Sequence, residues 1–483
     1  MLEPFQDWLQ PGWSQLGGPV SGQVVSAAGG RIHLVGIGGI GMSGIAEVLL
    51  TLGYSVSGSD LHESEATRRL AGLGAVLCYG HAAEVVENDI EVVVVSSAIG
   101  DDNPEVGRAR ELHIPVIPRA EMLAELMRAK CGVAVAGAHG KTTTTSLLSA
   151  VLAAGGFDPT MVVGGRLKSL GGTNARLGRS AYMVAEADES DGSFLLLRPA
   201  IAVVTNIDRE HMDYYGTMQR LTDAYVSFVN GIPFYGRAVL SADCERVGSI
   251  IDKIKKRYTT YGTTADAGLR AVDVQQQGLE TSFDVIREGR RLGRATVPMP
   301  GRHAALNALA AIAVGLEFGM NFEVCAGALA SFEGILRRFE VKGESGGVMV
   351  VDDYGHHPTE IRATLAAARV GLGRRIVAVF QPHRYTRTAD LFDDFSQAFT
   401  DADEVVVTDV YAAGEAPIEG AQASVLAEAI GRCHSGAVHY REAGPALAAE
   451  VARLARRGDV VITLGAGDIT RLGAEILRRL AAS

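Results

Sequence analysis

Short runs of β-branched and other apolar residues alternate along this chain with glycine turns and longer stretches of helical periodicity. In the first part of the chain the strand-like runs are 31–37, 55–60 and 92–99, and the helical stretches that follow them are 41–53, 63–74 and 104–112. Strands that alternate with helices predict βαβ units and a parallel sheet. We therefore expect a Rossmann-like α/β domain over residues 1–130.

The alternation begins again twice further along the chain. A second series has strand-like runs at 131–137, 181–188 and 199–208, and a third has them at 348–355, 374–381, 403–411 and 458–467. Between the two, residues 258–300 alternate like antiparallel strands with a turn at Gly278, so the central sheet should be mixed. The pattern predicts a central domain over 131–335 and a Rossmann-like C-terminal domain over 336–483.

The start of the central domain carries a phosphate-binding pattern. Residues 137–145 read GAHGKTTTT directly after the apolar run CGVAVA, so a strand stops at glycines and a helix opens with Lys-Thr-Thr. Backbone N–H groups, a lysine and a hydroxyl in this order suit a nucleotide polyphosphate with Mg²⁺, which predicts a P-loop-type ATPase domain. The loop differs from G-x-x-x-x-G-K-[ST], because Val135 stands five residues before Gly140. The candidate ATP-binding residues are Gly137, Ala138, His139, Gly140, Lys141, Thr142 and Thr143.

Two acidic clusters follow predicted strands of the same sheet. One contains Glu186, Asp188, Glu189 and Asp191, and the other contains Asp208, Glu210, His211 and Asp213. Ligands bind at the carboxyl ends of parallel strands, so both clusters could meet beside the phosphate loop and hold Mg²⁺. A solvated acidic loop is the alternative for either cluster.

The N-terminal domain has a glycine-rich loop of its own. Residues 36–41 read GIGGIG at the end of a strand, and Asp60 ends the next strand. This pattern lets a diphosphate approach the backbone at a helix N-terminus. A dinucleotide, a nucleotide-sugar and a purely structural tight turn all remain compatible with it.

The last third of the chain adds arginines and histidines at predicted strand ends. They stand in RRFE (337–340), DDYGHHP (352–358) and QPHRYTR (381–387). Arginine forks suit phosphate or carboxylate oxygens. Upstream, Asn307 opens a helix of small residues, where its amide could pair with an adenine edge or simply face solvent.

Composition narrows the class of protein. The 483 residues are enough for about three domains, and their net charge of -11 argues against nucleic acid bound through a general basic surface. The five cysteines lie far apart without a C-x-x-C pair, so neither a disulfide framework nor a cysteine zinc site is indicated. The N-terminus lacks the form of a signal peptide and no apolar run has the length of a membrane span. We expect a cytoplasmic protein.

Taken in order, these motifs resemble those of the Mur ligases, ATP-dependent amide-forming enzymes of peptidoglycan precursor synthesis. The resemblance covers about residues 31–470 and includes HLVGIGGIGMSGIAEVLL, GKTTTT, EADESDGSF, TNIDREHMD, RRFE, DDYGHHPTEI, FQPHRYTRT, DVYAAGE and GAGDIT. The segments IGGIGMSG and FQPHRYTRT favour the branch that joins L-alanine to UDP-N-acetylmuramate. The branch that adds a recycled tripeptide to the same nucleotide-sugar is the alternative. The resemblance implies ATP as co-substrate and Mg²⁺ as cofactor. We also expect no nucleic-acid partner, and a monomer or weak homodimer.

The resemblance also implies roles for individual residues. Lys141 would contact the β- and γ-phosphates, with Thr142, Glu186 and His211 as magnesium ligands and Arg338 as a phosphate contact from the third domain. The implied adenine and ribose contacts are Asn307 and Asp352. The implied UDP-sugar residues are Gly38, Gly39, Ile40 and Gly41, with Asp60 and Ser97 as further candidates, and the implied amino-acid residues are Tyr354, His383, Arg384 and Arg387.

Two positions depart from the family pattern. Ala138 replaces a common Thr or Ser in the phosphate loop, and Ala304 replaces the Asn of PGRHN. Neither position supplies the lysine or a metal ligand, so we expect activity to survive.

Two other functions are compatible with parts of the sequence. A non-catalytic nucleotide sensor is disfavoured by the intact Lys141, Glu186 and His211. An NAD-dependent oxidoreductase would explain only the first glycine loop and Asp60. A base for the amine proton is not evident, and His211 and His357 are the candidates.

Overall fold

The computed structural model describes residues 31–96, 99–168 and 173–481. The described residues divide into two compact units, one made of those from 31 to 272 with 284–295 and 306–332, the other of 273–283, 296–305 and 333–481. These described residues form three β-sheets, so the fold is the expected three-part α/β arrangement. No helix of the described ranges is both long and apolar enough to cross a membrane.

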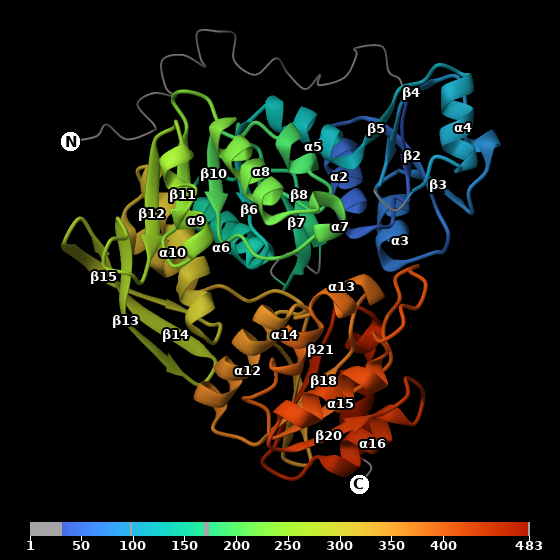
Figure 1. Cartoon of the computed structure of the whole chain (residues 1–483). Helices are drawn as coiled ribbons and strands as arrows, with labels where there is room; N and C mark the ends of the chain where they lie inside the picture. The colour runs from blue at the N-terminus through green and yellow to red at the C-terminus, as the bar shows by residue number, and fades with distance from the viewer. Residues whose placement is uncertain (1–30, 97–98, 169–172, 482–483) are drawn as a thin grey trace. The chain divides into compact units, whose positions relative to one another are not determined.

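The N-terminal sheet is fully parallel, which confirms the expected Rossmann-like arrangement. Its strands are β1 (Arg31–Val35), β2 (Ser55–Asp60), β3 (Val76–Tyr79), β4 (Ile90–Val95) and β5 (Val116–Pro118), in the order β3-β2-β1-β4-β5. The helices are α2 (Ile40–Thr51), α3 (Glu65–Gly72), α4 (Pro104–Glu111) and α5 (Arg119–Arg128) (Figure 1). Leu34 and Val35 on β1 are both fully buried, as a parallel sheet covered on both faces requires. The strand order reverses between β1 and β4, beside the glycine loop at 36–41.

A buried carboxylate ties this sheet to α4. Glu105, which is fully buried, accepts hydrogen bonds from His33 Nε2 (2.8 Å), Ser59 Oγ (2.8 Å) and His81 Nδ1 (2.7 Å). Burial alone would raise the pKa of Glu105, but the hydrogen bonds from these three side chains outweigh it and lower the pKa below the ordinary value. The network stabilises the domain only while Glu105 is ionised.

We expect Glu105→Gln to destabilise the protein by about 3 kcal/mol at neutral pH, because the change breaks a buried charged network. Since folding lowers the pKa of Glu105, its contribution is present above the unfolded pKa near 4.3 and disappears as the pH falls through the folded value. Urea unfolding between pH 3 and pH 7 measures both effects. Glu111→Gln on the exposed side of α4 is the matched control, and equal unfolding midpoints for the two variants would contradict the prediction.

The central sheet has ten strands in the order β15-β14-β13-β12-β11-β10-β6-β9-β7-β8. Strands β6 (Cys131–Ala136), β9 (Tyr182–Glu186), β10 (Ile201–Val204), β11 (Arg237–Ser241) and β12 (Tyr258–Gly262) lie parallel in the middle of this sheet. Strands β13 (Leu269–Gln277) and β14 (Glu280–Arg287) are joined by the predicted turn at Gly278, and β15 (Arg290–Val297) completes that edge. At the other edge, β7 (Thr160–Leu167) and β8 (Thr173–Arg176) pair antiparallel, a hairpin that the sequence patterns did not reveal. The sheet is therefore mixed, as expected.

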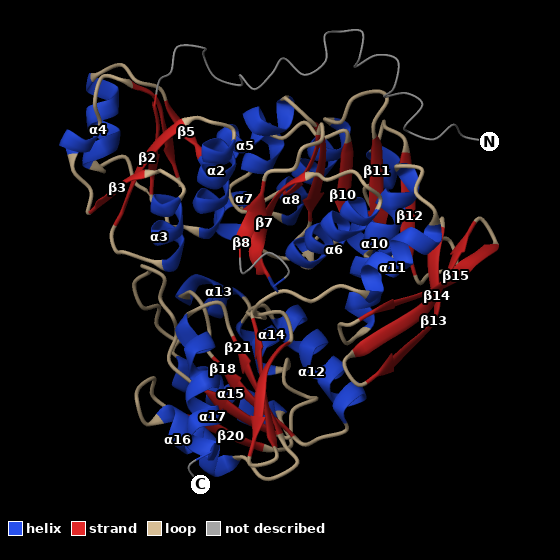
Figure 2. Ribbon diagram, turned by 180° about the vertical axis from the view of Figure 1, so that it is seen from behind, coloured by secondary structure: helices blue, strands red, loops and turns tan. Residues whose placement is uncertain are grey.

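Helices pack against this central sheet. Helix α6 (Lys141–Ala154) packs on β6, β7 and β9 and against α11 (Phe322–Ala330) (Figure 2). The remaining helices of this part are α7 (Met212–Tyr215), α8 (Met218–Asn230), α9 (Glu245–Gly248) and α10 (Arg302–Glu317). Because β6 leads directly into α6, the phosphate-loop pattern lies where a parallel strand ends and a helix begins.

The C-terminal sheet is mixed rather than purely Rossmann-like. Its strands are β16 (Glu340–Ser345), β17 (Val348–Asp353), β18 (Ile376–Phe380), β19 (Glu404–Val407), β20 (Ala437–Tyr440) and β21 (Val460–Leu464), in the order β16-β17-β21-β18-β19-β20. All neighbours are parallel except β16 and β17, which form a hairpin. The helices are α12 (Pro358–Leu372), α13 (Tyr385–Asp390), α14 (Phe392–Ser396), α15 (Ala423–Cys433), α16 (Leu447–Leu454) and α17 (Leu472–Ala481). The expected parallel α/β core is present, with the strand after RRFE added as an antiparallel edge.

Candidate ATP and nucleotide-sugar site

The phosphate loop links β6 to α6 and depends on two glycines. Gly137 and Gly140 have φ values of 139° and 78°, in the left-handed region that favours glycine. A Cβ atom would lie 1.9 Å from Thr205 Oγ1 at Gly137 and 2.6 Å from Asn307 Oδ1 at Gly140. Any other residue at either position would hold a strained backbone and would force these neighbouring side chains to shift. The predicted glycine-to-helix geometry is present.

Lys141 is folded back against its own loop and a buried carboxylate. Its Nζ donates to the Gly137 carbonyl oxygen (2.6 Å) and to both carboxylate oxygens of Glu189 (2.9 and 2.8 Å). Burial acts to lower the pKa of Lys141, but the nearby carboxylates, chiefly Glu189, raise it above the ordinary value. The lysine therefore stays charged at the loop. The sequence placed Glu189 in an acidic cluster without identifying it as the lysine's partner.

Thr142 and Glu186 lie together next to this lysine. The Thr142 hydroxyl donates to Glu186 Oε2 (2.9 Å), which also accepts the backbone N–H of Gly164 (2.8 Å). A hydroxyl and a carboxylate are hard oxygen ligands of the kind that Mg²⁺ prefers. Two of the three predicted magnesium ligands are therefore adjacent and chemically suited to the ion.

His211, the third predicted ligand, lies beside the lysine's carboxylate partner. Its backbone adopts the left-handed conformation (φ 57°) just before α7. Its Nε2 lies 3.3 Å from Glu210 Oε2 and 3.9 Å from Glu189 Oε1. Lys141 and His211 thus share Glu189, and both acidic segments meet at the phosphate loop.

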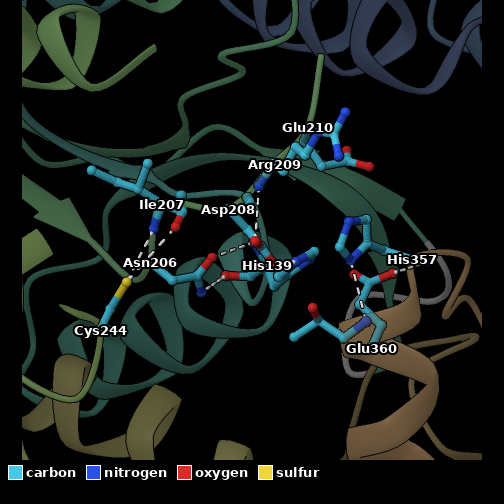
Figure 3. A network of polar contacts seen from close by, with 12 residues as sticks. His139, Asn206, Ile207, Asp208, Arg209, Glu210, Cys244, His357 and Glu360 are labelled. Atoms are coloured by element: carbon cyan, nitrogen blue, oxygen red, sulfur yellow. Dashed lines mark hydrogen bonds and ion pairs between the residues drawn. The ribbon is translucent and has the colours of Figure 1, made fainter. Parts of the chain in front are cut away.

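The segment after β10 holds the phosphate loop in place (Figure 3). His139 donates its backbone N–H to Asn206 Oδ1 (2.9 Å), and Asn206 Nδ2 donates back to the His139 carbonyl oxygen (2.9 Å). Nε2 of the His139 ring lies 3.1 Å from Asp208 Oδ2. Ala138 donates its N–H to the Asn206 carbonyl oxygen (3.3 Å), so the missing hydroxyl at position 138 leaves these backbone contacts intact. Asn206 was not predicted as a site residue, although it stands at a strand end.

Asn307 is buried directly behind the phosphate loop. Its Oδ1 accepts the Thr144 hydroxyl (3.2 Å) and lies against Gly140. This placement puts Asn307 beside the phosphate loop, and its adenine contact stays a prediction.

The N-terminal glycine loop is hydrogen-bonded to an acidic side chain. Gly38 donates its N–H to Asp60 Oδ2 (2.8 Å), and α2 begins just after Gly39, at Ile40. Asp60 therefore lies at the loop that was predicted to bind a diphosphate. Ser97, the other candidate from this region, lies outside the described residues.

In the second unit, Asp352 is an interior residue. It is fully buried and accepts hydrogen bonds from the hydroxyls of Thr463 (2.7 Å) and Thr470 (2.6 Å). A ribose contact by Asp352 stays a prediction and requires this buried carboxylate to become accessible. His357, a candidate base, caps α12, where its Nδ1 accepts the N–H of Thr359 (3.2 Å).

The predicted amino-acid residues and the predicted phosphate contact Arg338 all lie in this unit. The guanidinium carbon of Arg338 lies 5.0 Å from the centre of the Tyr354 ring, and the His383 ring stacks on Tyr411 at 5.4 Å. Arg387 donates to the His383 carbonyl oxygen (3.1 Å), and Arg384 lies 3.8 Å from Glu415. Burial, with the neighbouring His356 and arginines, lowers the pKa of His383 to about 3. His383 therefore presents a neutral ring among cations.

Family models match the chain in three consecutive parts. Residues 31–131 match "Mur ligase family, catalytic domain", residues 135–315 "Mur ligase middle domain", and residues 337–467 "Mur ligase, glutamate ligase domain". The chain is 57% identical over 454 residues to a UDP-N-acetylmuramate–L-alanine ligase of Geobacter sp. (strain M21), covering 94% of this chain and 98% of the relative. A ligase of the same description from Anaeromyxobacter sp. (strain Fw109-5) is 57% identical over 456 residues, with coverage of 94% and 98%.

Solved structures agree with these matches. The crystal structure of a UDP-N-acetylmuramate–alanine ligase from Thermotoga maritima has a TM-score of 0.79 at 30% identity, covering 94% of this chain and 99% of that chain. A murein peptide ligase from Psychrobacter arcticus 273-4 has a TM-score of 0.69 at 24% identity, with coverage of 94% and 99%, which shows a likeness of fold alone.

Proposed function

This chain belongs to the Mur ligase family, and we propose that it joins L-alanine to the carboxylate of UDP-N-acetylmuramate with hydrolysis of ATP, in peptidoglycan synthesis. The observation that carries this proposal is the 57% identity over 94% of the chain to ligases of that description. The position of Lys141 at a glycine loop, with Thr142 and Glu186 beside it, supports an ATP-dependent step.

The proposed reaction activates the carboxylate before the amine attacks. A free carboxylate resists attack because an oxide ion is a poor leaving group. Its oxygen therefore takes the γ-phosphoryl group of ATP, which gives an acyl phosphate and ADP. The neutral amine of L-alanine then attacks the acyl carbon, phosphate leaves, and the amine loses a proton. The protein's work is mainly to position these groups and to neutralise their charge.

Residues of the first unit serve the phosphates in this proposal. Lys141 exchanges its Glu189 and carbonyl partners for the β- and γ-phosphate oxygens. Thr142, Glu186 and His211 would hold Mg²⁺, which when bound neutralises charge between ATP and the substrate carboxylate. Asn307 is proposed to contact adenine, and the loop at 36–41 with Asp60 to receive the UDP diphosphate.

Residues of the second unit serve the amino acid and the transferred phosphate. Arg338 is proposed as the phosphate contact. Tyr354, His383, Arg384 and Arg387 are proposed to frame L-alanine, with an arginine on its carboxylate. We propose 1–130, 131–335 and 336–483 as the limits of the three domains.

A phosphate-release assay tests the function. Purified protein receives Mg²⁺, ATP and UDP-N-acetylmuramate, with L-alanine, with a tripeptide, or with no amine. We expect release that depends on both the nucleotide-sugar and L-alanine. Release that depends on the tripeptide instead would make the chain a recycling ligase, and binding without any release would make it a sensor.

A further inference from the structure

Arg119 lies between the N-terminal glycine-rich segment and the acidic cluster that borders the phosphate loop. It is the first residue of α5, and its side chain is largely buried, with 22% of its surface exposed. Its guanidinium lies against Gly41, in the first turn of α2, and donates to Asp188 Oδ2 (3.3 Å) in the acidic cluster. Arg119 lies outside the sequence motifs and has no role in the proposed function.

The glycine at position 41 makes room for this arginine. A Cβ atom there would lie 3.0 Å from both Cδ and Nη1 of Arg119 and 3.2 Å from its Cζ. Gly41 is inside α2 and does not have a positive φ, so backbone strain does not explain the glycine. The last glycine of the G-x-G-x-x-G pattern therefore leaves space for the Arg119 guanidinium beside the first turn of α2.

Asp188 links this arginine to the ATP loop. Asp188 directly precedes Glu189, whose carboxylate accepts two hydrogen bonds from Lys141 Nζ (2.9 and 2.8 Å). Arg119 and Lys141 are therefore held by neighbouring carboxylates of the same acidic cluster.

We propose that Arg119 is a substrate-binding residue that exchanges Asp188 for an anionic group of the nucleotide-sugar. This inference rests on the proposed function, because the nucleotide-sugar supplies two such groups, a diphosphate and a carboxylate. Either group offers the oxygen pair that a guanidinium fork binds. Arg119 thereby places the nucleotide-sugar's anion next to the acidic cluster that borders Lys141.

Calorimetric titration without ATP tests the inference. Arg119→Ala and Arg119→Lys are compared with Arg110→Ala, an exposed arginine of α4, for binding of UDP-N-acetylmuramate and of UDP-N-acetylglucosamine, which lacks the carboxylate. We expect Arg119→Ala to weaken UDP-N-acetylmuramate binding about 10- to 100-fold, with partial recovery in Arg119→Lys. A similar loss with both ligands assigns the diphosphate to Arg119, and a loss with UDP-N-acetylmuramate alone assigns the carboxylate.

ADP binding serves as the measure of an intact fold in each variant. Unchanged UDP-N-acetylmuramate affinity in Arg119→Ala would overturn the inference, and so would an equal loss of ADP binding. The outcome is distinct from a failure of the proposed function, which would appear in the unmodified protein as no phosphate release that depends on L-alanine.

Discussion

Replacing Lys141 with alanine should reduce ligation by about 1,000- to 100,000-fold, the range for removal of a cation that stabilises phosphoryl transfer. The lysine is the cation at the phosphate loop, and carboxylates keep it charged there. UDP-N-acetylmuramate binding should remain, because its proposed loop lies on another sheet. Phosphate release at saturating substrates measures the first effect, and calorimetric titration with the nucleotide-sugar measures the second.

Removal of Lys141 also leaves Glu189 without its main partner. Burial already raises the pKa of Glu189, so the carboxyl can take up a proton when the lysine is absent, and the fold should survive. Lys141→Gln retains hydrogen-bond donors for Glu189 and separates loss of charge from loss of folding. Lys253→Ala, at a half-exposed lysine paired with Asp223, is the matched control. A near-normal rate in Lys141→Ala would refute the phosphate-loop assignment.

Glu186→Gln should raise the Mg²⁺ concentration needed for half-maximal turnover by at least about 10-fold. Glu186 Oε2 lies with the Thr142 hydroxyl, and a neutral amide is a weaker ligand for a hard cation than a carboxylate. Turnover should be measured over a Mg²⁺ series at fixed ATP. Removal of Mg²⁺ with EDTA should abolish turnover in the unmodified protein.

The matched control for Glu186→Gln is Glu87→Gln, at an exposed carboxylate paired with Arg31. If both variants require the same Mg²⁺ concentration as the unmodified protein, Glu186 is not a metal ligand. If Glu186→Gln instead loses activity equally at every Mg²⁺ concentration, its hydrogen bonds to Thr142 and Gly164 matter more than metal binding.

Much of the fold could be predicted because it is encoded in short-range patterns. The alternation of apolar runs and helical stretches correctly indicated a parallel N-terminal sheet, a mixed central sheet and a parallel α/β core in the C-terminal part. The hairpin of β7 and β8 escaped prediction, because its strands contain glycine and polar residues and lack regular alternation. The antiparallel edge strand β16 was not predicted either. Its side chains are largely half-buried and do not alternate between buried and exposed, so it lacks the alternating pattern that marks a strand.

The candidate site was partly predictable for a related reason. Carboxyl ends of parallel strands meet at one edge of a sheet, so residues after β6, β9 and β10 had to lie near one another. That rule places whole segments, and it does not choose between Glu186 and Glu189 as the partner of Lys141. It also did not indicate that Asp352 would be buried under two threonine hydroxyls.

The sequence by itself therefore determined the order of α/β elements, the phosphate loop and the family resemblance, because these depend on residues close together in the chain. The tertiary structure alone decided which distant side chains pair. Glu189 meets Lys141 across 48 residues, and Asp188 meets Arg119 across 69. Such pairs depend on the approach of side chains from different elements, within fractions of an ångström, and no local pattern specifies that approach. Gly41 illustrates the difference. The motif predicted a glycine that lets a phosphate approach the backbone, and the fold shows that a side chain there would crowd Arg119.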